Sequence, residues 1–279
     1  PPRPTEPVQT WTSPKMKIRI HGGSWSRFEA EGQVSFFSSE GMQTMQYGSG
    51  PAPKDFTSLV EQPKEGRFSP YQNNGGTCLA LAGDDFCIVA ADSRLSMGYS
   101  IMSRTTSKIS QLTSRCCIAS SGCNADQTTL HKYLKFRMQM YEHQHGKELS
   151  APAIGQMLAG TLYGRRFFPY YTFNVVGGLD EKGEGVVFSY DAVGCFERLK
   201  YSVSGTGQAL IEPFLDNLVA YKNTDKKPTV DRTCEETLEL VKDIFASAGE
   251  RDIYTGDFVD IYVMKKEGTT YEQFPLKKD

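Results

Sequence analysis

The sequence predicts an α+β fold of four layers, in which two packed β-sheets are covered by helices on both outer faces. Apolar strand-like runs occur in hairpin pairs, and the helical patterns come in two separated pairs. The earliest strands of the ordered part are continuously apolar, which is typical of strands covered on both faces. Helices and strands do not alternate singly, which argues against a doubly wound parallel sheet.

The first expected element is a hairpin, in which two continuously apolar runs flank a Gly-Asp-Asp turn at 83–85. Asp92 and Arg94 follow the second run, and Lys108 comes after a polar segment. Charged groups at the end of a buried strand need partners, because an unpaired buried charge is very costly. The hairpin therefore predicts a cluster of fixed charges, which is either a catalytic site or the remnant of one.

The remaining elements are predicted from the hydrophobic periodicity and from the Gly- and Pro-rich segments that interrupt it. They are expected, in order, as strands from 108 and over 115–122, helices over about 124–146 and 150–166, strands over 170–176, 185–190 and 195–203, helices over about 210–218 and 233–248, and strands over 258–263 and 271–274. Two helices carry start signals. Ser150 is an expected N-cap with Pro152 in the first turn, and Thr233 with Glu236 forms a capping box.

Residues 1–66 differ in composition from the rest of the chain. They are rich in Pro, Gly, Ser, Gln and Glu, show no sustained hydrophobic period, and contain a breaker cluster at 48–53. We expect a disordered, leader-like extension over 1–66 and a folded domain over 67–279. An exposed loop is expected at 222–228.

Composition excludes several function classes. The net charge of -2 and the lack of a basic block give no support for nucleic-acid binding, and no apolar run is long enough to span a membrane. The seven cysteines are odd in number and lack CxxC spacing, which favours reduced, buried thiols over disulfides. His143 and His145 do not share a helix face, so a solvated pair is favoured over a zinc site. We expect no metal and no cofactor.

The motifs of the hairpin occur in a fixed order, with Gly76-Thr77 and Leu79-Ala80 first, then 88–94, then Lys108. Together they resemble the beta subunits of the 20S proteasome, which belong to the N-terminal nucleophile hydrolases. The resemblance covers about 67–279 and implies the αββα sandwich of that family. Three longer motifs are similar to the beta type-1 group within the family, and they lie at 162–171, 177–181 and 250–257.

In catalytic members of the family, a threonine at the mature N-terminus attacks the peptide carbonyl, with its own free α-amine as general base. A nearby lysine lowers the pKa of the nucleophile. The resemblance places the nucleophile sixteen residues before the Asp of the Asp-Ser-Arg motif and thirty-two before the Lys. Counting back from Asp92 and from Lys108 leads in both cases to Gly76. Glycine has no side chain, so it can neither attack a substrate nor excise its own leader.

By the same count Thr77 is not the nucleophile, although the Gly76-Thr77 pair mimics the usual cleavage point and makes Thr77 a decoy. It lies one residue out of register with both charged groups. A one-residue slip in a strand points a side chain to the opposite face. A bulge at Gly75 could restore the register, but Leu79-Ala80 fits the family pattern without any insertion.

Supporting positions of the family site persist in part. The resemblance implies such roles for six residues, which are Asp92, Arg94, Lys108, Thr206, Asp252 and Thr255. Thr206 and Thr255 stand where serine is usual, and Asp257 replaces a usual glycine. The set is either a vestigial site or, as we favour, a buried ion-pair network that holds the first hairpin.

The leading hypothesis is a non-catalytic structural subunit of the 20S core particle, acting in ATP- and ubiquitin-dependent protein degradation in cytoplasm and nucleus. The resemblance implies partners in a seven-membered beta ring, a second beta ring, the alpha ring and, indirectly, the regulatory particle. It also implies that an active neighbour trims the leader near Gly66-Arg67. The alternatives are an active N-terminal threonine endopeptidase that uses Thr77 after cleavage at Gly76, and a stand-alone binding protein on the same sandwich.

Overall fold

The computed structural model describes residues 69–222 and 232–279, together with short strands between residues 19 and 44. The chain divides into two compact units, 1–68 and 69–279. The strands of the first unit are β1 (Arg19–Ile20), β2 (Gly23–Ser24), β3 (Glu29–Ala30), β4 (Gln33–Ser38) and β5 (Gly41–Thr44). The other residues of the expected leader, the cut at Gly66-Arg67 and most of the loop at 222–228 lie outside the described residues, so these expectations stay predictions.

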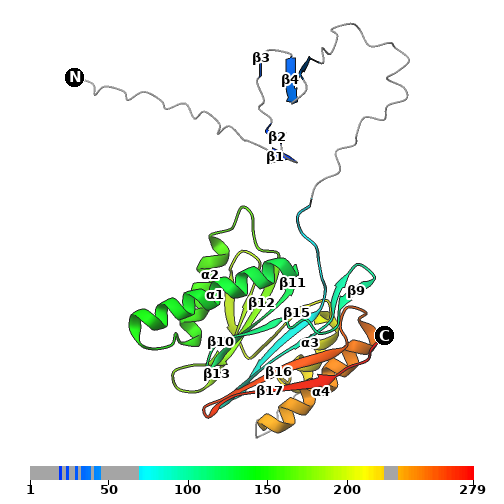
Figure 1. The fold of residues 1–279 in the computed structure, drawn as a ribbon. Helices are drawn as coiled ribbons and strands as arrows, with labels where there is room; N and C mark the ends of the chain where they lie inside the picture. The colour runs from blue at the N-terminus through cyan, green and yellow to red at the C-terminus, as the bar shows by residue number, and fades with distance from the viewer. Residues whose placement is uncertain are drawn as a thin grey trace, which may run out of the picture. The chain divides into compact units, whose positions relative to one another are not determined.

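Ten strands of the second unit form two five-stranded antiparallel sheets (Figure 1). One sheet has the order β10 (Ile109–Thr113), β11 (Cys116–Gly122), β12 (Thr172–Leu179), β13 (Gly185–Tyr190), β14 (Phe196–Leu199). The other has the order β15 (Tyr201–Gly205), β6 (Thr77–Ala82), β7 (Phe86–Asp92), β16 (Phe258–Lys265), β17 (Gly268–Pro275). The expected hairpin is the β6–β7 pair, at the centre of the second sheet.

Helices cover the outer face of each sheet. Helices α1 (Asn124–His145) and α2 (Ala151–Tyr163) pack on the first sheet, and α3 (Gln208–Leu218) and α4 (Cys234–Arg251) pack on the second. A third apolar cluster fills the space between the sheets. The four-layer α+β sandwich predicted from the sequence is therefore the observed fold.

Strands β6 and β7 show why their sequences are apolar throughout. Leu79 and Ile88 face the helices α3 and α4, whereas Ala80 and Val89 face the other sheet. Successive strand residues point to opposite faces, so a strand that is covered on both faces needs apolar residues at every position.

The predicted strand over 195–203 was wrong as a single element. The chain bends at Lys200, so that β14 pairs with β13 in one sheet and β15 pairs with β6 in the other. Both halves have strand-like composition, and only pairing with different sheets separates them. The short hairpin of β8 (Leu95–Met97) and β9 (Ser100–Ser103) was also not predicted.

Two helix boundaries test the predicted start signals. Thr233 and Glu236 form the reciprocal hydrogen bonds of a capping box at α4, as predicted. Ser150 occupies the N-cap position of α2, but its side chain makes no capping hydrogen bond. Helix α2 ends at Tyr163, earlier than the predicted end near Arg166.

All seven cysteines are free thiols. Six are buried, and Cys195, in the turn before β14, is exposed. None of the helices in the described part of the chain combines the length and apolar composition needed to cross a bilayer.

Candidate functional site

Gly76 lies against the two charged residues that the spacing pointed to. A Cβ atom placed on Gly76 would lie 2.2 Å from Cε and 2.7 Å from Nζ of Lys108, and 2.9 Å from Oδ1 of Asp92. The backbone φ of Gly76 is +90°, a conformation that side-chain-bearing residues rarely adopt. The position that the count assigned to the nucleophile is therefore occupied by a buried glycine, and it has no room for a side chain.

Asp92 and Lys108 form a buried ion pair beside this glycine. The Lys108 Nζ lies 3.2 Å from Oδ1 of Asp92, and it donates to the carbonyl oxygen of Asp92 at 2.9 Å and also to that of Arg94. Burial raises the pKa of Asp92, and the Lys108 charge opposes this rise. The carboxylate also accepts the N–H groups of Thr77 at 2.7 Å and Arg94 at 3.2 Å. All the polar groups of the pair are thus satisfied within the chain.

The Thr77 hydroxyl points away from this ion pair. Its Oγ1 lies 2.7 Å from Oγ1 of Thr255 and accepts the N–H of Gly207 at 2.9 Å. The side chain is fully buried. The amide nitrogen of Thr77 is bonded to Gly76 and cannot serve as a free amine. The buried hydroxyl is thus bonded to Thr255 and Gly207 and makes no hydrogen bond to Asp92 or Lys108.

Asp252 is the acceptor for two hydroxyl groups on the same side as Thr77. The hydroxyls of Thr206 and Thr255 each donate to Oδ2 of Asp252 at 2.6 Å. Since the Thr255 proton is used for Asp252, the Thr77 hydroxyl is the donor in its bond to Thr255. A chain of hydrogen bonds therefore runs from the Gly207 N–H through Thr77 and Thr255 to the carboxylate.

Arg94 belongs to a separate ion-pair cluster. Its Nε donates to Oδ2 of Asp257 at 2.8 Å, and its Nη1 donates to the carbonyl of Ile253 at 2.8 Å. Arg104 contacts the other oxygen of Asp257. Burial would raise the pKa of Asp257, but the hydrogen bonds and charges of the two arginines bring it below its usual range. Asp257, which stands where the family usually has glycine, has a φ of +69° and a fully buried side chain. Its carboxylate is the common partner of the two arginines of this cluster.

Three side-chain groups meet around Gly76 and Thr77. The Thr77 N–H donates to Asp92, the Thr206 N–H donates to the Gly76 carbonyl at 3.0 Å, and the Arg94 backbone bonds to both Asp92 and Lys108. Asp92 and Lys108 lie beside Gly76, Asp252 with its threonines lies beside Thr77, and Arg94 leads to Asp257. Sequence reasoning noted the unusual Asp257 but missed that it pairs with Arg94. A charged residue directly before an apolar strand was the available signal.

Asn74 was also missed, although it ties the segment before Gly76 to three elements. Its N–H donates to the carbonyl of Gly122 at 2.9 Å, and its Oδ1 accepts the first N–H of α1, from Asn124, at 2.9 Å. Its Nδ2 donates to the carbonyl of Ser96 at 3.0 Å. The N-cap residue of α1, Cys123, makes no side-chain capping bond, so Asn74 supplies the cap from another part of the chain. No local sequence pattern indicates such a cap, because Asn74 and Asn124 are 50 residues apart in the chain.

A cavity of about 320 Å³ lies beside Gly76. Its lining is mostly small or polar and includes Ser121, Ser204, Thr206 and Gln208. Cys78 is the nearest thiol on β6, and burial raises its pKa to about 12, so it is not a thiolate at neutral pH.

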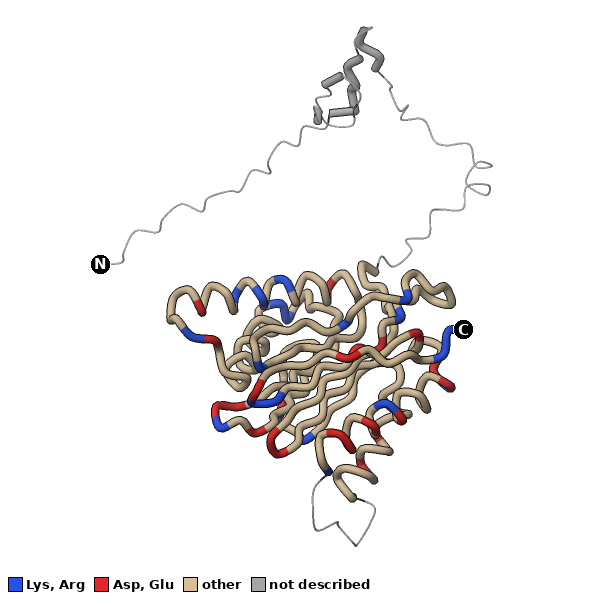
Figure 2. The backbone as a smooth tube through the Cα atoms, turned by 60° about the horizontal axis from the view of Figure 1, so that its bottom comes forward, with Lys and Arg blue, Asp and Glu red and all other residues tan. Residues whose placement is uncertain are grey.

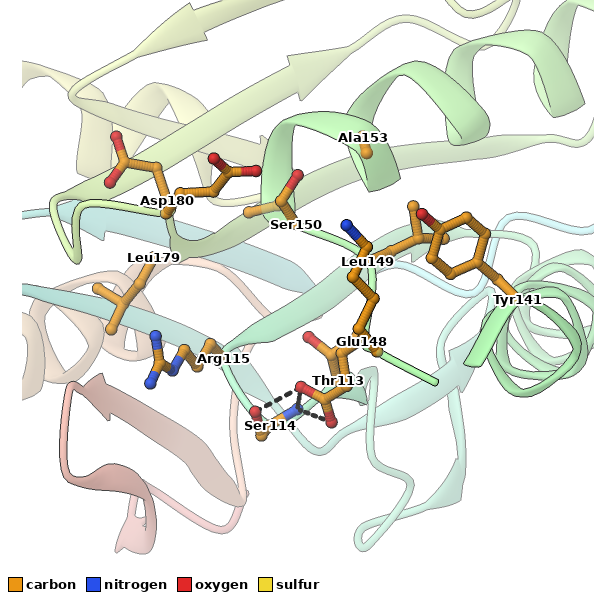
Figure 3. Close-up of a pocket in the computed structure, with 13 residues that line it drawn as sticks. Thr113, Ser114, Arg115, Tyr141, Glu148, Leu149, Ser150, Ala153, Leu179 and Asp180 are labelled. Atoms are coloured by element: carbon orange, nitrogen blue, oxygen red, sulfur yellow. Dashed lines mark hydrogen bonds between the residues drawn. The ribbon is translucent and has the colours of Figure 1, made fainter. Parts of the chain in front are cut away.

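A second cavity, of about 400 Å³, lies near the start of α2 (Figure 3). The Ser114 N–H and hydroxyl both donate to Glu148, and Arg115 and Asp180 also line the cavity. Its charges are of both signs, with Arg115 and Lys147 facing Glu148, Asp180 and Glu181 in the lining. Within the described ranges, no group of three or more His, Cys, Asp or Glu side chains is placed to hold a metal ion.

His131 is the one histidine on the inner face of α1. Its Nε2 lies 2.7 Å from the Ser120 hydroxyl, and its Nδ1 lies 3.1 Å from that of Ser110. Burial, with a smaller contribution from Lys135, lowers its pKa to about 4. His131 therefore joins α1 to strands β10 and β11 as a neutral, structural side chain. His143 and His145 lie in the exposed last turn of the same helix.

Comparison with known proteins agrees with this fold. Residues 72–264 match the family model described as "Proteasome subunit". The chain is 54% identical over 213 residues to proteasome subunit beta type-1 of Oryza sativa subsp. japonica, a match that covers 75% of this chain and 96% of that protein. It is 52% identical over 230 residues to proteasome subunit beta type-1 of Dictyostelium discoideum, covering 80% and 98%. The yeast protein named proteasome subunit beta type-6 is 40% identical over 226 residues, covering 78% and 94%. With the family model matching more than half of its length and these identities over nearly the whole of each relative, the chain belongs to the proteasome subunit family.

Proposed function

We propose that the chain is a non-catalytic beta subunit of the 20S proteasome core particle. The observation that carries the proposal is the place of Gly76, which fills the position beside Lys108 and Asp92 where catalytic members have a threonine. A hydrolase of this type needs a nucleophilic side chain and a free amine on one residue. Gly76 supplies no nucleophile, and Thr77 is buried with its hydroxyl bonded to Thr255 and Gly207.

Its role is then architectural. The chain completes a seven-membered beta ring, beside a second beta ring and an alpha ring, in a complex that degrades proteins by an ATP- and ubiquitin-dependent route in cytoplasm and nucleus. The retained charges of Asp92, Lys108 and Arg94 stabilise the central hairpin, because removing one member of a buried ion pair leaves the other unpaired. An active neighbour trims the leader near Gly66-Arg67.

The Asn74 contacts supply a further reason against cleavage at Gly76. A cut there would remove Asn74 and with it the cap of α1 and the bonds to Gly122 and Ser96. Cleavage near Gly66-Arg67 leaves all of these bonds in place. The proposed processing and the proposed absence of activity thus have the same structural basis.

The N-terminal residue of the assembled chain, measured by intact mass, tests the proposal. A terminus at or before Arg67 is expected. A terminus at Thr77, or covalent labelling of Thr77 by a nucleophile-directed inhibitor, would show an active threonine endopeptidase instead. A native chain that migrates alone at about its own mass of 31.1 kDa would contradict assembly and support a stand-alone binding protein.

A further inference from the structure

Asn74 is followed by glycine, which makes it the asparagine of this chain that is most susceptible to deamidation. The sequence contains six asparagines, and Asn74 is the only one with glycine as the next residue. The backbone nitrogen of the next residue can attack the side-chain amide carbon of an asparagine and close a five-membered succinimide ring. A side chain on that next residue hinders the attack, and glycine has none.

The reaction replaces an amide by a carboxylate. The Gly75 nitrogen loses its proton to solvent and attacks Cγ of Asn74, so that the N–Cγ bond forms and the Cγ–Nδ2 bond breaks. Nδ2 takes up a proton from solvent and leaves as ammonia. Water then opens the ring, at Cγ to give aspartate or at the main-chain carbonyl carbon to give isoaspartate. One water is consumed and one ammonia is released, and nothing is oxidised or reduced.

Three hydrogen bonds of the folded chain oppose the ring closure. The Asn74 Nδ2 donates to the Ser96 carbonyl at 3.0 Å, and its Oδ1 accepts the Asn124 N–H at 2.9 Å, so both ends of the side-chain amide are held. The Gly75 N–H donates to Oδ1 of Asn73 at 3.0 Å, which keeps the proton on the attacking nitrogen. The amide that is attacked and the nitrogen that attacks are therefore both bonded to other groups.

The main chain around Asn74 is fixed as well. Its N–H donates to the Gly122 carbonyl at 2.9 Å, and its carbonyl accepts the N–H of Ser96 at 3.3 Å and the Ser96 hydroxyl at 3.1 Å. Gly75 is buried, and a Cβ placed on it would lie 2.8 Å from Cβ of Tyr254. Ring closure requires rotation about the main chain and the side chain of Asn74, so the segment must open before the reaction occurs.

Aspartate at position 74 loses one of the two side-chain bonds. A carboxylate has no N–H, so an oxygen replaces the Nδ2 donor against the Ser96 carbonyl. The carboxylate still accepts the Asn124 N–H, where a negative charge is favourable at the start of α1. Most charged residues of the described chain lie on the helices and in the turns (Figure 2), and the residues that Asn74 contacts, Ser96, Gly122 and Asn124, are uncharged. The new charge therefore has no cation among these partners.

Isoaspartate disturbs the segment further. It adds one carbon to the main chain between residues 74 and 75. The main-chain bonds of Asn74 to Gly122 and Ser96 and the packing of Gly75 on Tyr254 then cannot all be kept.

We propose that Asn74 is a deamidation site whose rate is set by folding. The folded chain protects Asn74, and a chain whose 72–76 segment is open converts it to aspartate and isoaspartate. The products do not restore the side-chain bond to Ser96, so deamidation before folding leaves a permanent change in the segment that caps α1. The inference rests on the contacts of Asn74 and Gly75 alone and is independent of whether the chain is catalytic.

Deamidation rates in the folded and the unfolded chain test the proposal. The full chain, purified in its native form, is incubated at mildly alkaline pH with and without urea, and peptide mapping by mass spectrometry quantifies the conversion of each asparagine. The reaction requires the loss of three hydrogen bonds, each contributing a factor of about five, so Asn74 should react on the order of a hundredfold more slowly in the folded chain. Asn217, which leucine follows, is the internal standard and should react more slowly than Asn74 in urea. Equal rates at Asn74 with and without urea, or no reaction at Asn74 in urea, would overturn the proposal.

Two variants of Asn73 form a matched pair that changes one hydrogen bond and leaves Asn74-Gly75 intact. Asn73 is exposed, and its side chain is the acceptor of the Gly75 N–H. Asn73→Ala removes this acceptor and should raise the rate in the folded chain by about fivefold, whereas Asn73→Asp keeps an acceptor and should change it by less than about twofold. In urea the wild type and both variants should react at similar rates. An equal gain of Asn73→Ala in urea would show that the fold does not control the reaction and would contradict the proposal.

The variant Asn74→Asp reproduces the aspartate product and tests its fit. In hydrogen exchange, the Ser96 N–H should exchange about fivefold faster or more, while the Asn124 N–H keeps its protection, because only the contact with Ser96 loses its side-chain donor. Unchanged exchange at Ser96 would show that the product fits the site and would refute the permanent change that we propose.

Discussion

Replacing Thr77 by valine tests whether this residue is structural. Valine has nearly the same shape as threonine and lacks the hydroxyl, so the packing of β6 is retained while two hydrogen bonds are lost. The Gly207 N–H, now 2.9 Å from Oγ1, is left buried without its acceptor, and the Thr255 hydroxyl loses its donor. An unsatisfied buried donor costs about 1–3 kcal/mol, and the second lost bond adds about 1 kcal/mol. We expect the free energy of unfolding to fall by about 2–4 kcal/mol.

Urea unfolding of the full chain, followed by circular dichroism, measures this change. The matched control is Thr77→Ser, which retains the hydroxyl and removes one buried methyl, at a cost of about 1 kcal/mol. In assembled particles, both variants should leave all peptidase activities as they are. A Thr77→Val variant as stable as wild type would refute the hydrogen-bond argument, and loss of a peptidase activity in that variant alone would refute the non-catalytic assignment.

Four further predictions use the same measurements. Gly76→Thr should destabilise the chain by more than about 2 kcal/mol and confer no activity, because the new Cβ overlaps Lys108 and the backbone φ is +90°; a stable, active variant would contradict the site as described. Lys108→Met should cost about 3–5 kcal/mol by leaving Asp92 buried without its cation, and adding Asp92→Asn should recover part of the loss if the pair is the cause. Asn74→Ala should cost about 1–3 kcal/mol through loss of the α1 cap and its other bonds, and hydrogen exchange should rise first at the start of α1 rather than uniformly. The pKa of His131 is lower in the folded than in the unfolded chain, so the unfolded state binds the extra proton. The free energy of unfolding should therefore fall as the pH is lowered from about 6.5 to about 4, by about 3 kcal/mol in total. His131→Asn should flatten this part of the pH profile, and an unchanged profile would exclude His131 as its source.

The sequence determined the layers of this protein, because hydrophobic period and turn residues are local properties. The continuously apolar runs of β6 and β7 required cover on both faces of the strands. Helices α3 and α4 cover one face and the other sheet covers the second. The capping box of α4 could also be predicted from the sequence, since its two residues, Thr233 and Glu236, lie within one helical turn. The count that leads to Gly76 came instead from the resemblance to the family, which implies the spacing of the nucleophile from Asp92 and Lys108.

Only the tertiary structure decided which distant groups meet. The split of the 195–203 segment at Lys200 depends on which sheet each half joins, and the composition of the two halves does not record it. The pairing of Arg94 with Asp257 and the capping of α1 by Asn74 join residues far apart in the chain. Such contacts are fixed by the packing of whole elements, whereas a sequence pattern carries information mainly about neighbours along the chain. The sequence and the family resemblance therefore located a glycine where a nucleophile is expected. The fold decided that the Thr77 hydroxyl is bonded to Thr255 and Gly207 and not to Asp92 or Lys108.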